Sequence, residues 1–121
     1  MNVSACVNEI LVRGLDDWIQ AAEVASIART LGGAKGDDEI REVSMEIVCQ
    51  VLDRKLMEIG DVSQLGFQSW RVSLSEVLAR IDAAWRRRYH EPNLGDLFWL
   101  NLTDLGQRTA NEVCERAKTC R

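Results

Sequence analysis

A long amphipathic segment, residues 37–62, constrains the fold of this chain more than any other feature. Its apolar residues recur at helical spacing, so one face of the expected helix is apolar and the other carries charge. Gly36, Asp37 and Asp38 mark the start, because carboxylates cap free amides and favour the positive end of a helix dipole. Gly60 marks the end. The apolar face must be buried, and it consists of Ile40, Val43, Ile47, Val48, Val51, Leu52 and Leu56.

Two shorter helices are predicted before this segment. Apolar residues at helical spacing indicate a first helix over residues 3–13, which Gly14 closes. Small and apolar residues indicate a second helix over about residues 18–31, which Asp16 or Asp17 can cap. The alanines of the second helix permit close helix packing.

Two further helices are predicted after it. Ser73 and Glu76 have the spacing of a capping box, ahead of an apolar stripe that continues to about Tyr89. Thr103 can cap a last helix over about residues 104–117. The chain is therefore expected to contain about five helices.

Strands are predicted only in short stretches. Residues 61–70 hold isolated apolar side chains between Ser and Gly, which favours a loop with at most a short strand over residues 65–68. Residues 97–102 are aromatic and bounded by turn residues, which suits a strand with a buried face. The expected fold class is mainly α with a small β-hairpin.

Length and apolar content limit the chain to one domain, residues 1–121. No apolar run approaches the ~20 residues needed to cross a bilayer, and the N-terminus lacks the pattern of a secretory signal. Four scattered cysteines form no Cys-x-x-Cys pair. We therefore expect a soluble cytoplasmic protein with no membrane association.

The order of these elements resembles a winged-helix (winged helix-turn-helix) domain. Residues 55–62 resemble the exit from the third helix of such domains. The run Leu102-Thr103-x-x-Gly106-x-x-x-Ala110 is similar to the entry of the wing's second strand into the closing helix of small winged-helix regulators. An inserted segment at about 63–93 would place a whole helix within the wing. The resemblance implies a winged-helix-like fold in which the third helix would normally contact DNA.

Charge argues against DNA binding by that helix. Residues 1–62 hold 12 acidic and 6 basic side chains, and residues 63–121 hold 7 acidic and 9 basic ones. Carboxylates beside phosphates repel them and release no counterions, so the nonspecific term of DNA affinity has the wrong sign. A solvated first turn that favours the helix dipole accounts for two or three of the acids. The positions that would meet DNA are Asp37, Asp38, Glu39, Arg41, Glu42, Ser44, Met45 and Glu46.

A basic segment suggests DNA binding as the alternative function. It would serve a DNA-binding transcriptional regulator that dimerises through its terminal helices and reaches phosphates with arginine. The competing interpretation is a solvated helix end, because helical spacing spreads the three consecutive arginines over about 200°. The segment contains Arg80, Arg86, Arg87 and Arg88.

Nothing in the sequence indicates catalysis, a cofactor or a metal. The single histidine, His90, lies in a predicted turn without a nucleophile motif. The glycine-rich residues 32–36 lack the Gly-Lys-Ser/Thr ending of a phosphate loop. We therefore expect no enzyme, no cofactor and no metal site.

The primary prediction is a non-catalytic domain that binds a basic protein, as an immunity or antitoxin-like inhibitor does. Opposite charges speed encounter and disfavour wrong partners. Among the tryptophans, Trp70, beside Phe67 and Arg71, is the candidate for an interface, although a core position is favoured for it. The acidic residues expected to bind the partner are Asp37, Asp38, Glu39, Glu42 and Glu46.

Overall fold

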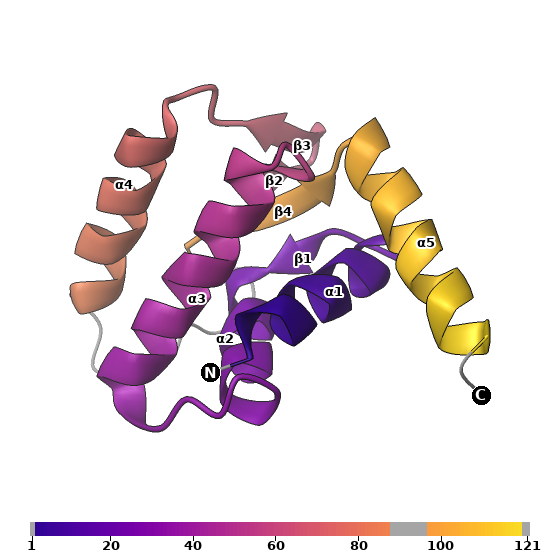
Figure 1. The fold of residues 1–121 in the computed structure, drawn as a ribbon. Coiled ribbons are helices and arrows are strands. Elements are labelled where there is room, and N and C mark those ends of the chain that lie inside the picture. The colour runs from indigo at the N-terminus through magenta and orange to yellow at the C-terminus, as the bar shows by residue number, and fades with distance from the viewer. Residues whose placement is uncertain (1, 88–96, 120–121) are drawn as a thin grey trace.

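The computed structural model describes residues 2–87 and 97–119, with side chains through residue 117. This part of the chain contains five helices, as predicted, and is mainly helical (Figure 1). The predicted β-hairpin is too small, because four strands form one antiparallel sheet in the order β1-β4-β2-β3. The elements are α1 (Val3–Gly14), β1 (Ile19–Gln20), α2 (Ala21–Thr30), α3 (Gly36–Asp53), β2 (Met57–Ser63), β3 (Gly66–Ser69), α4 (Leu74–Arg86), β4 (Trp99–Leu102) and α5 (Asp104–Thr119).

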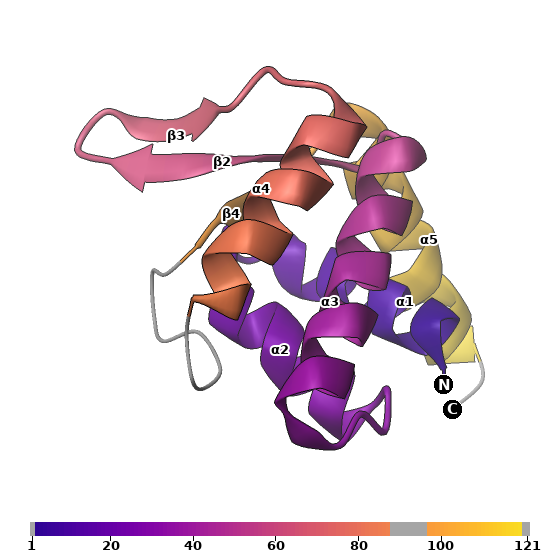
Figure 2. The ribbon, with the colours of Figure 1, turned by 90° about the vertical axis from the view of Figure 1, so that its left-hand side faces the viewer.

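Helix α3 is the central element, as its apolar stripe predicts. It packs against α1, α2, α4 and β2, and Figures 1 and 2 show it running between α4 and the α1–α2 pair. Asp37 and Asp38 lie in its first turn, while Lys35 at the N-cap makes no side-chain capping bond. The residues of α3 that are buried in the core are Ile40, Val43, Ile47, Val48 and Val51.

The prediction that this helix continues to Gly60 is wrong, because a Schellman motif ends it at Asp53. Lys55 adopts a left-handed conformation with φ 61°. Its N–H donates to the Leu52 carbonyl at 3.1 Å, and the Leu56 N–H donates to the Val51 carbonyl at 2.9 Å. Glycine usually occupies the left-handed position, so Lys55 gave no visible stop signal. Residues 57–63 are strand β2 instead.

The predicted start of the second helix is also wrong. Ile19 and Gln20 form strand β1, whose partners are Leu100 and Trp99 of β4. Helix α2 begins only at Ala21, with Gln20 at its N-cap and no side-chain capping bond. Pairing with a strand about eighty residues later in the chain therefore decides the local structure here.

The predicted caps of the last two helices are confirmed. Ser73 accepts a hydrogen bond from the Glu76 backbone N–H at 3.2 Å. Thr103 accepts one from the Gly106 N–H at 3.0 Å, and its hydroxyl donates to the Lys55 carbonyl at 2.6 Å. Thr103 thus caps α5 and also ties it to the turn after α3.

The region predicted as a loop with a short strand forms the hairpin β2–β3. Its strands pair from Gly60 opposite Ser69 to Ser63 opposite Gly66, and Gly66 supplies the left-handed φ of 94° after the turn. Val62 lies opposite Phe67. Figure 2 shows the hairpin extending beyond the helices.

The strand predicted within residues 97–102 is confirmed as β4, which lies between β1 and β2, but it begins only at Trp99, after Leu97 with a left-handed φ of 70°. Leu100 is fully buried, whereas Trp99 is half-buried. Among the described helices, none combines the length and apolar character that crossing a bilayer requires.

Candidate protein-binding face

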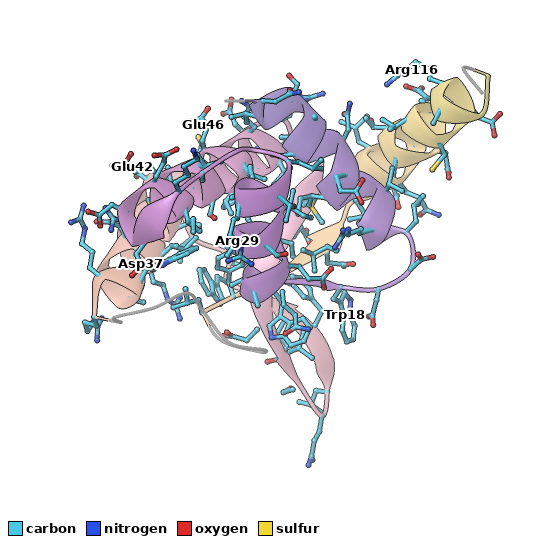
Figure 3. All side chains as sticks on the ribbon, turned by 90° about the horizontal axis from the view of Figure 1, so that it is seen from below. Trp18, Arg29, Asp37, Glu42, Glu46 and Arg116 are labelled. Carbon is cyan, nitrogen blue, oxygen red and sulfur yellow. The ribbon has the colours of Figure 1, made fainter. Side chains whose placement is uncertain are left out.

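The acidic residues of α3 lie along its exposed side. Asp37, Asp38 and Glu39 form the first turn, and Glu42 and Glu46 follow at helical spacing, all five being exposed. Figure 3 shows Glu42 and Glu46 pointing away from the body of the protein. The buried apolar stripe fixes the rotation of α3 and thereby holds these carboxylates in solvent.

Two of the positions that a DNA-binding third helix would present are not on this exposed side. Arg41 is only 8% exposed and Ser44 is fully buried. They sit between α3 and its neighbours, so they could not contact DNA without unpacking the helix. Within the described residues, the accessible side of the first half of α3 carries acids, with Met45 half-buried among them.

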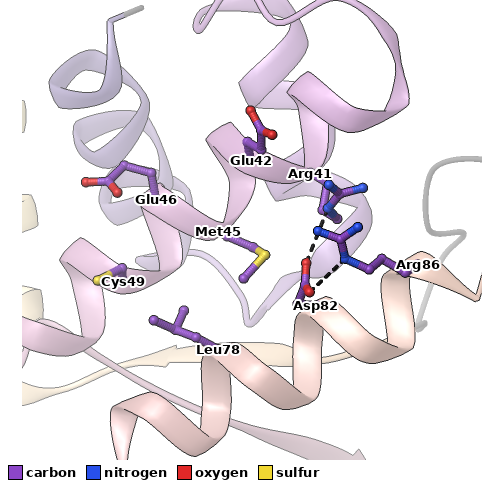
Figure 4. A pocket seen from close by; sticks show the side chains of 8 residues that line it. All are labelled: Arg41, Glu42, Met45, Glu46, Cys49, Leu78, Asp82 and Arg86. Carbon is purple, nitrogen blue, oxygen red and sulfur yellow. Dashed lines mark hydrogen bonds and ion pairs between the residues drawn. The ribbon is translucent and has the colours of Figure 1, made fainter.

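A groove of about 340 Å³ separates the acidic side of α3 from α4 (Figure 4). Met45 and Leu78 face one another across it and give it an apolar floor. Glu42 and Glu46 border it on the α3 side. At the Glu46 end, away from Arg41 and Arg86, an apolar floor beside a carboxylate suits a basic side chain, whose methylene groups need apolar contact and whose charge needs a carboxylate (Figure 4).

Asp82 of α4 closes one end of this groove by binding two arginines. Its Oδ2 accepts a hydrogen bond from Arg86 Nε at 2.8 Å, and its Oδ1 lies 3.4 Å from Arg41 Nε. Arg41 also donates from Nη1 to Asp38 at 2.9 Å. Asp82 was not predicted as a site residue. Its spacing to Arg86 signals the first ion pair, but the bridge to Arg41 depends on how α3 and α4 pack.

Each predicted DNA-binding arginine that the structure describes has an intramolecular partner. The Arg80 guanidinium lies 4.0 Å from the centre of the Trp70 ring. The hydrogen bond to Asp82, followed by the charge of that carboxylate, raises the pKa of Arg86. Arg87 Nε donates to the Ala83 carbonyl at 3.2 Å. Arg88, like His90, lies outside the described residues.

Trp70 is half-buried rather than displayed on the surface. It packs against the hydrophobic core, and Arg80 lies over its ring. Its indole N–H is buried and has no hydrogen-bond partner among the described residues. The structure therefore does not bring Trp70 together with the acidic residues of α3.

Cys49 lines the same groove but is unsuited to be a nucleophile. Burial raises the pKa of its thiol, and the negative charges of Glu46 and Asp53 raise it further. A thiol in that environment stays protonated at neutral pH, whereas nucleophilic cysteines need a lowered pKa. Within the described residues, no group of three or more His, Cys, Asp or Glu side chains is arranged to hold a metal ion.

A second groove, of about 520 Å³, lies between α1 and α5. Its lining is mostly apolar and includes Val12, the exposed Leu31 and the half-buried Val113. Helix α5 contacts the body mainly through its first half, where Gly106 and Ala110 are buried. This groove is a potential contact surface without the acidic character of α3.

Comparison of the chain with protein-family models, with curated proteins and with solved structures gave no match.

Proposed function

We propose that this protein is a non-catalytic binding domain that uses the exposed acidic side of α3 to hold a basic protein. One observation carries the proposal. Asp37, Glu39, Glu42 and Glu46 form no ion pair with any described residue. Their negative charge therefore remains available to a partner, where charge complementarity would accelerate encounter.

The groove beside α3 adds an apolar component to this proposed interface. Charged rims contribute mainly to association rate and specificity, while buried apolar contacts hold a complex together. Met45 and Leu78 provide such contacts within reach of Glu42 and Glu46. A basic side chain of the partner would insert here, with its stem on the floor and its head group at the border.

We also propose that the fold is a winged-helix variant. The order α1-β1-α2-α3-β2, followed by β4 pairing between β1 and β2, supports this assignment. β3 and α4 then constitute the insertion expected at about residues 63–93. In this proposal, the helix that reads DNA in other winged-helix domains instead carries the acidic protein-binding side.

The alternative, a DNA-binding regulator, has less support. Arg80 stacks on Trp70, and Arg86 is held by Asp82. A phosphate at either arginine would have to share it with that contact, and at Arg86 it would lie beside the Asp82 carboxylate, which repels it. The acidic side of α3 lies beside Arg86, since Asp38 and Glu42 also raise its pKa, and these acids would repel the same phosphates.

The biological role that best suits a small acidic domain of this kind is inhibition of a basic toxin or nuclease in the cytoplasm. An immunity or antitoxin-like inhibitor must bind fast and specifically, which favours electrostatic steering. This role rests on the charge and size of the chain together with the unpaired acids of α3.

The proposal is tested by reversing charge on α3 and, separately, elsewhere. Glu42→Lys with Glu46→Lys is compared with Asp61→Lys and Glu112→Lys, an equal change at exposed residues outside α3. Proteins captured from source-cell lysate are identified, and their association rates are measured by surface plasmon resonance. We expect a basic partner whose association slows at least about tenfold with the α3 variant only.

Equal capture by both variants would contradict the proposal. A parallel measurement uses the fluorescence anisotropy of a labelled random DNA duplex at low and moderate salt. We expect no binding, whereas binding that weakens steeply with salt would favour the regulator.

A further inference from the structure

The sheet has an open edge at β3. One hydrogen bond shows which backbone N–H and C=O groups of this strand point outward. The Trp70 N–H donates to the Ile59 carbonyl at 3.0 Å. In an antiparallel pair, hydrogen-bonded and non-hydrogen-bonded positions alternate. The backbone groups of Gly66 and Gln68 therefore point toward β2, and those of Phe67 and Ser69 point outward.

This edge is short, but it lacks the charged residues and the proline that often prevent edge strands from pairing. β3 consists of Gly66–Ser69 and contains no charged residue and no proline. Within the described part of the chain, no strand lies beyond it. The hairpin extends away from the helices (Figure 2), and Leu65 at its tip is 84% exposed. An extended backbone can therefore approach this edge.

We propose that a second copy of this chain pairs with this edge, β3 to β3 and antiparallel, about a two-fold axis at Gln68. Phe67 would then lie opposite the partner's Ser69, and both copies would exchange hydrogen bonds through their outward N–H and C=O groups. The two four-stranded sheets would join into one. Arg71 has φ 56°, which ends the extended conformation and limits the pairing to this short segment.

The side chains around this edge are complementary to themselves. Phe67 is half-buried against Trp18, with ring centroids 6.5 Å apart, and retains an exposed side. In the proposed register its diagonal neighbour is the partner's Phe67, which allows an aromatic contact. No like charges face one another because β3 is uncharged. These features favour a second copy over a charged peptide.

Sedimentation velocity of the full chain, from micromolar to millimolar concentration, tests the proposal. Ser69→Pro removes an outward N–H without removing a bond to β2, and edge strands tolerate such a proline. By symmetry the dimer loses two hydrogen bonds, so we expect its dissociation constant to rise by at least about tenfold. Ser69→Ala retains the N–H and is the matched control, which should dimerise like the natural chain.

The apolar groove between α1 and α5 provides the competing interface. Val113→Asp places a charge in that groove and should leave a β3 dimer intact. A natural chain that is monomeric throughout the concentration range overturns the proposal. A dimer that Val113→Asp abolishes and Ser69→Pro preserves overturns it as well, because the terminal helices would then form the contact.

A cross-link tests the register even if Ser69→Pro fails to fold. Non-hydrogen-bonded residues that face one another have Cα atoms about 4.5 Å apart, which is within disulfide reach. Gln68→Cys, with Cys49, Cys114 and Cys120 changed to Ser, should therefore form an intermolecular disulfide on mild oxidation. Asp61→Cys, on the same side of the hairpin but one strand farther from the axis, is the control. Equal cross-linking of both variants contradicts the register.

Discussion

Helices α3 and α4 face one another across a single groove, yet their charged residues are in opposite situations. The acids of α3 at Asp37, Glu39 and Glu42 have no hydrogen bond or ion pair to any described residue. Arg80 and Arg86 of α4 are held by Trp70 and Asp82. The number of charges on a helix therefore does not define a binding surface. What matters is how many of them the fold leaves available.

The largest expected effect concerns Asp82, on which the engagement of Arg86 depends. Asp82→Asn leaves Arg41 buried with only the exposed Asp38 to offset its charge. We expect the free energy of unfolding to fall by about 1–2 kcal/mol, less than for a fully buried pair because Asp82 is partly exposed. Urea denaturation measures the change. Asp61→Asn, which removes an exposed carboxylate without an ion pair to any described residue, is the control and should change stability by less than about 0.5 kcal/mol.

Arg41→Met shows whether the buried charge of Arg41 stabilises the fold or whether Asp82 and Asp38 only offset the cost of burying it. Methionine retains much of the packing and removes the buried charge, so we expect stability within about 1 kcal/mol of the natural chain. A larger loss than that of Asp82→Asn would show that the Arg41–Asp82 pair itself stabilises the packing of α3 on α4.

A smaller effect is expected where Arg80 covers Trp70. Arg80→Ala removes a cation–π contact at an exposed position, which should lower the free energy of unfolding by about 0.5–1 kcal/mol. It should also alter the fluorescence of the Trp70 indole. Comparing the spectra of the Trp70→Phe variant with and without Arg80→Ala shows whether the change comes from Trp70 and not from another tryptophan. Arg87→Ala is the matched control, because the one partner that Arg87 has among the described residues is the Ala83 carbonyl of α4. If both substitutions lower the free energy of unfolding equally, the contact with Trp70 does not hold Arg80, which would then be as free to bind a partner as a solvated arginine.

The elements that local signals define could be predicted from the sequence. Helix α4 begins where Ser73 and Glu76 place it, and α5 begins at the residue after Thr103. The apolar stripe of α3 correctly identifies the buried side, and hence the exposed position of Glu42 and Glu46.

The features that pairing between distant segments defines could not be predicted. β1 is two residues long and exists through its register with β4. The end of α3 depends on a left-handed lysine, where the sequence offers no glycine. The bridge from Asp82 to Arg41 joins residues forty-one positions apart. Local periodicity contains no information about which side chains meet between two helices, so it identified the acidic side and missed what closes the groove.

The reactivity of the Cys49 thiol measures the electrostatic potential on the acidic side of α3 when no partner protein is bound. The smallest of the expected effects concerns this reactivity. Glu46 and Asp53 raise the pKa of the Cys49 thiol after burial has done so. Because only the thiolate reacts with iodoacetamide, Glu46→Gln should lower that pKa, increase the thiolate fraction and speed alkylation about two- to fivefold at mildly alkaline pH. The rate rises with pH in both proteins, with a lower midpoint in Glu46→Gln. Peptide mapping by mass spectrometry separates Cys49 from the other thiols.

Glu42→Gln removes the same charge from the same helix, but about two turns from Cys49, whereas Glu46 lies closer and is the carboxylate whose charge raises the pKa of that thiol most. It should therefore leave the alkylation rate nearly unchanged. Added salt should reduce the difference between Glu46→Gln and the natural chain, since it screens charges at a partly exposed site. If both substitutions accelerate alkylation equally, the potential belongs to the whole acidic side of α3 rather than to the single carboxylate beside Cys49. The availability of charge on α3 would then be a collective property, and a partner would experience it as one surface.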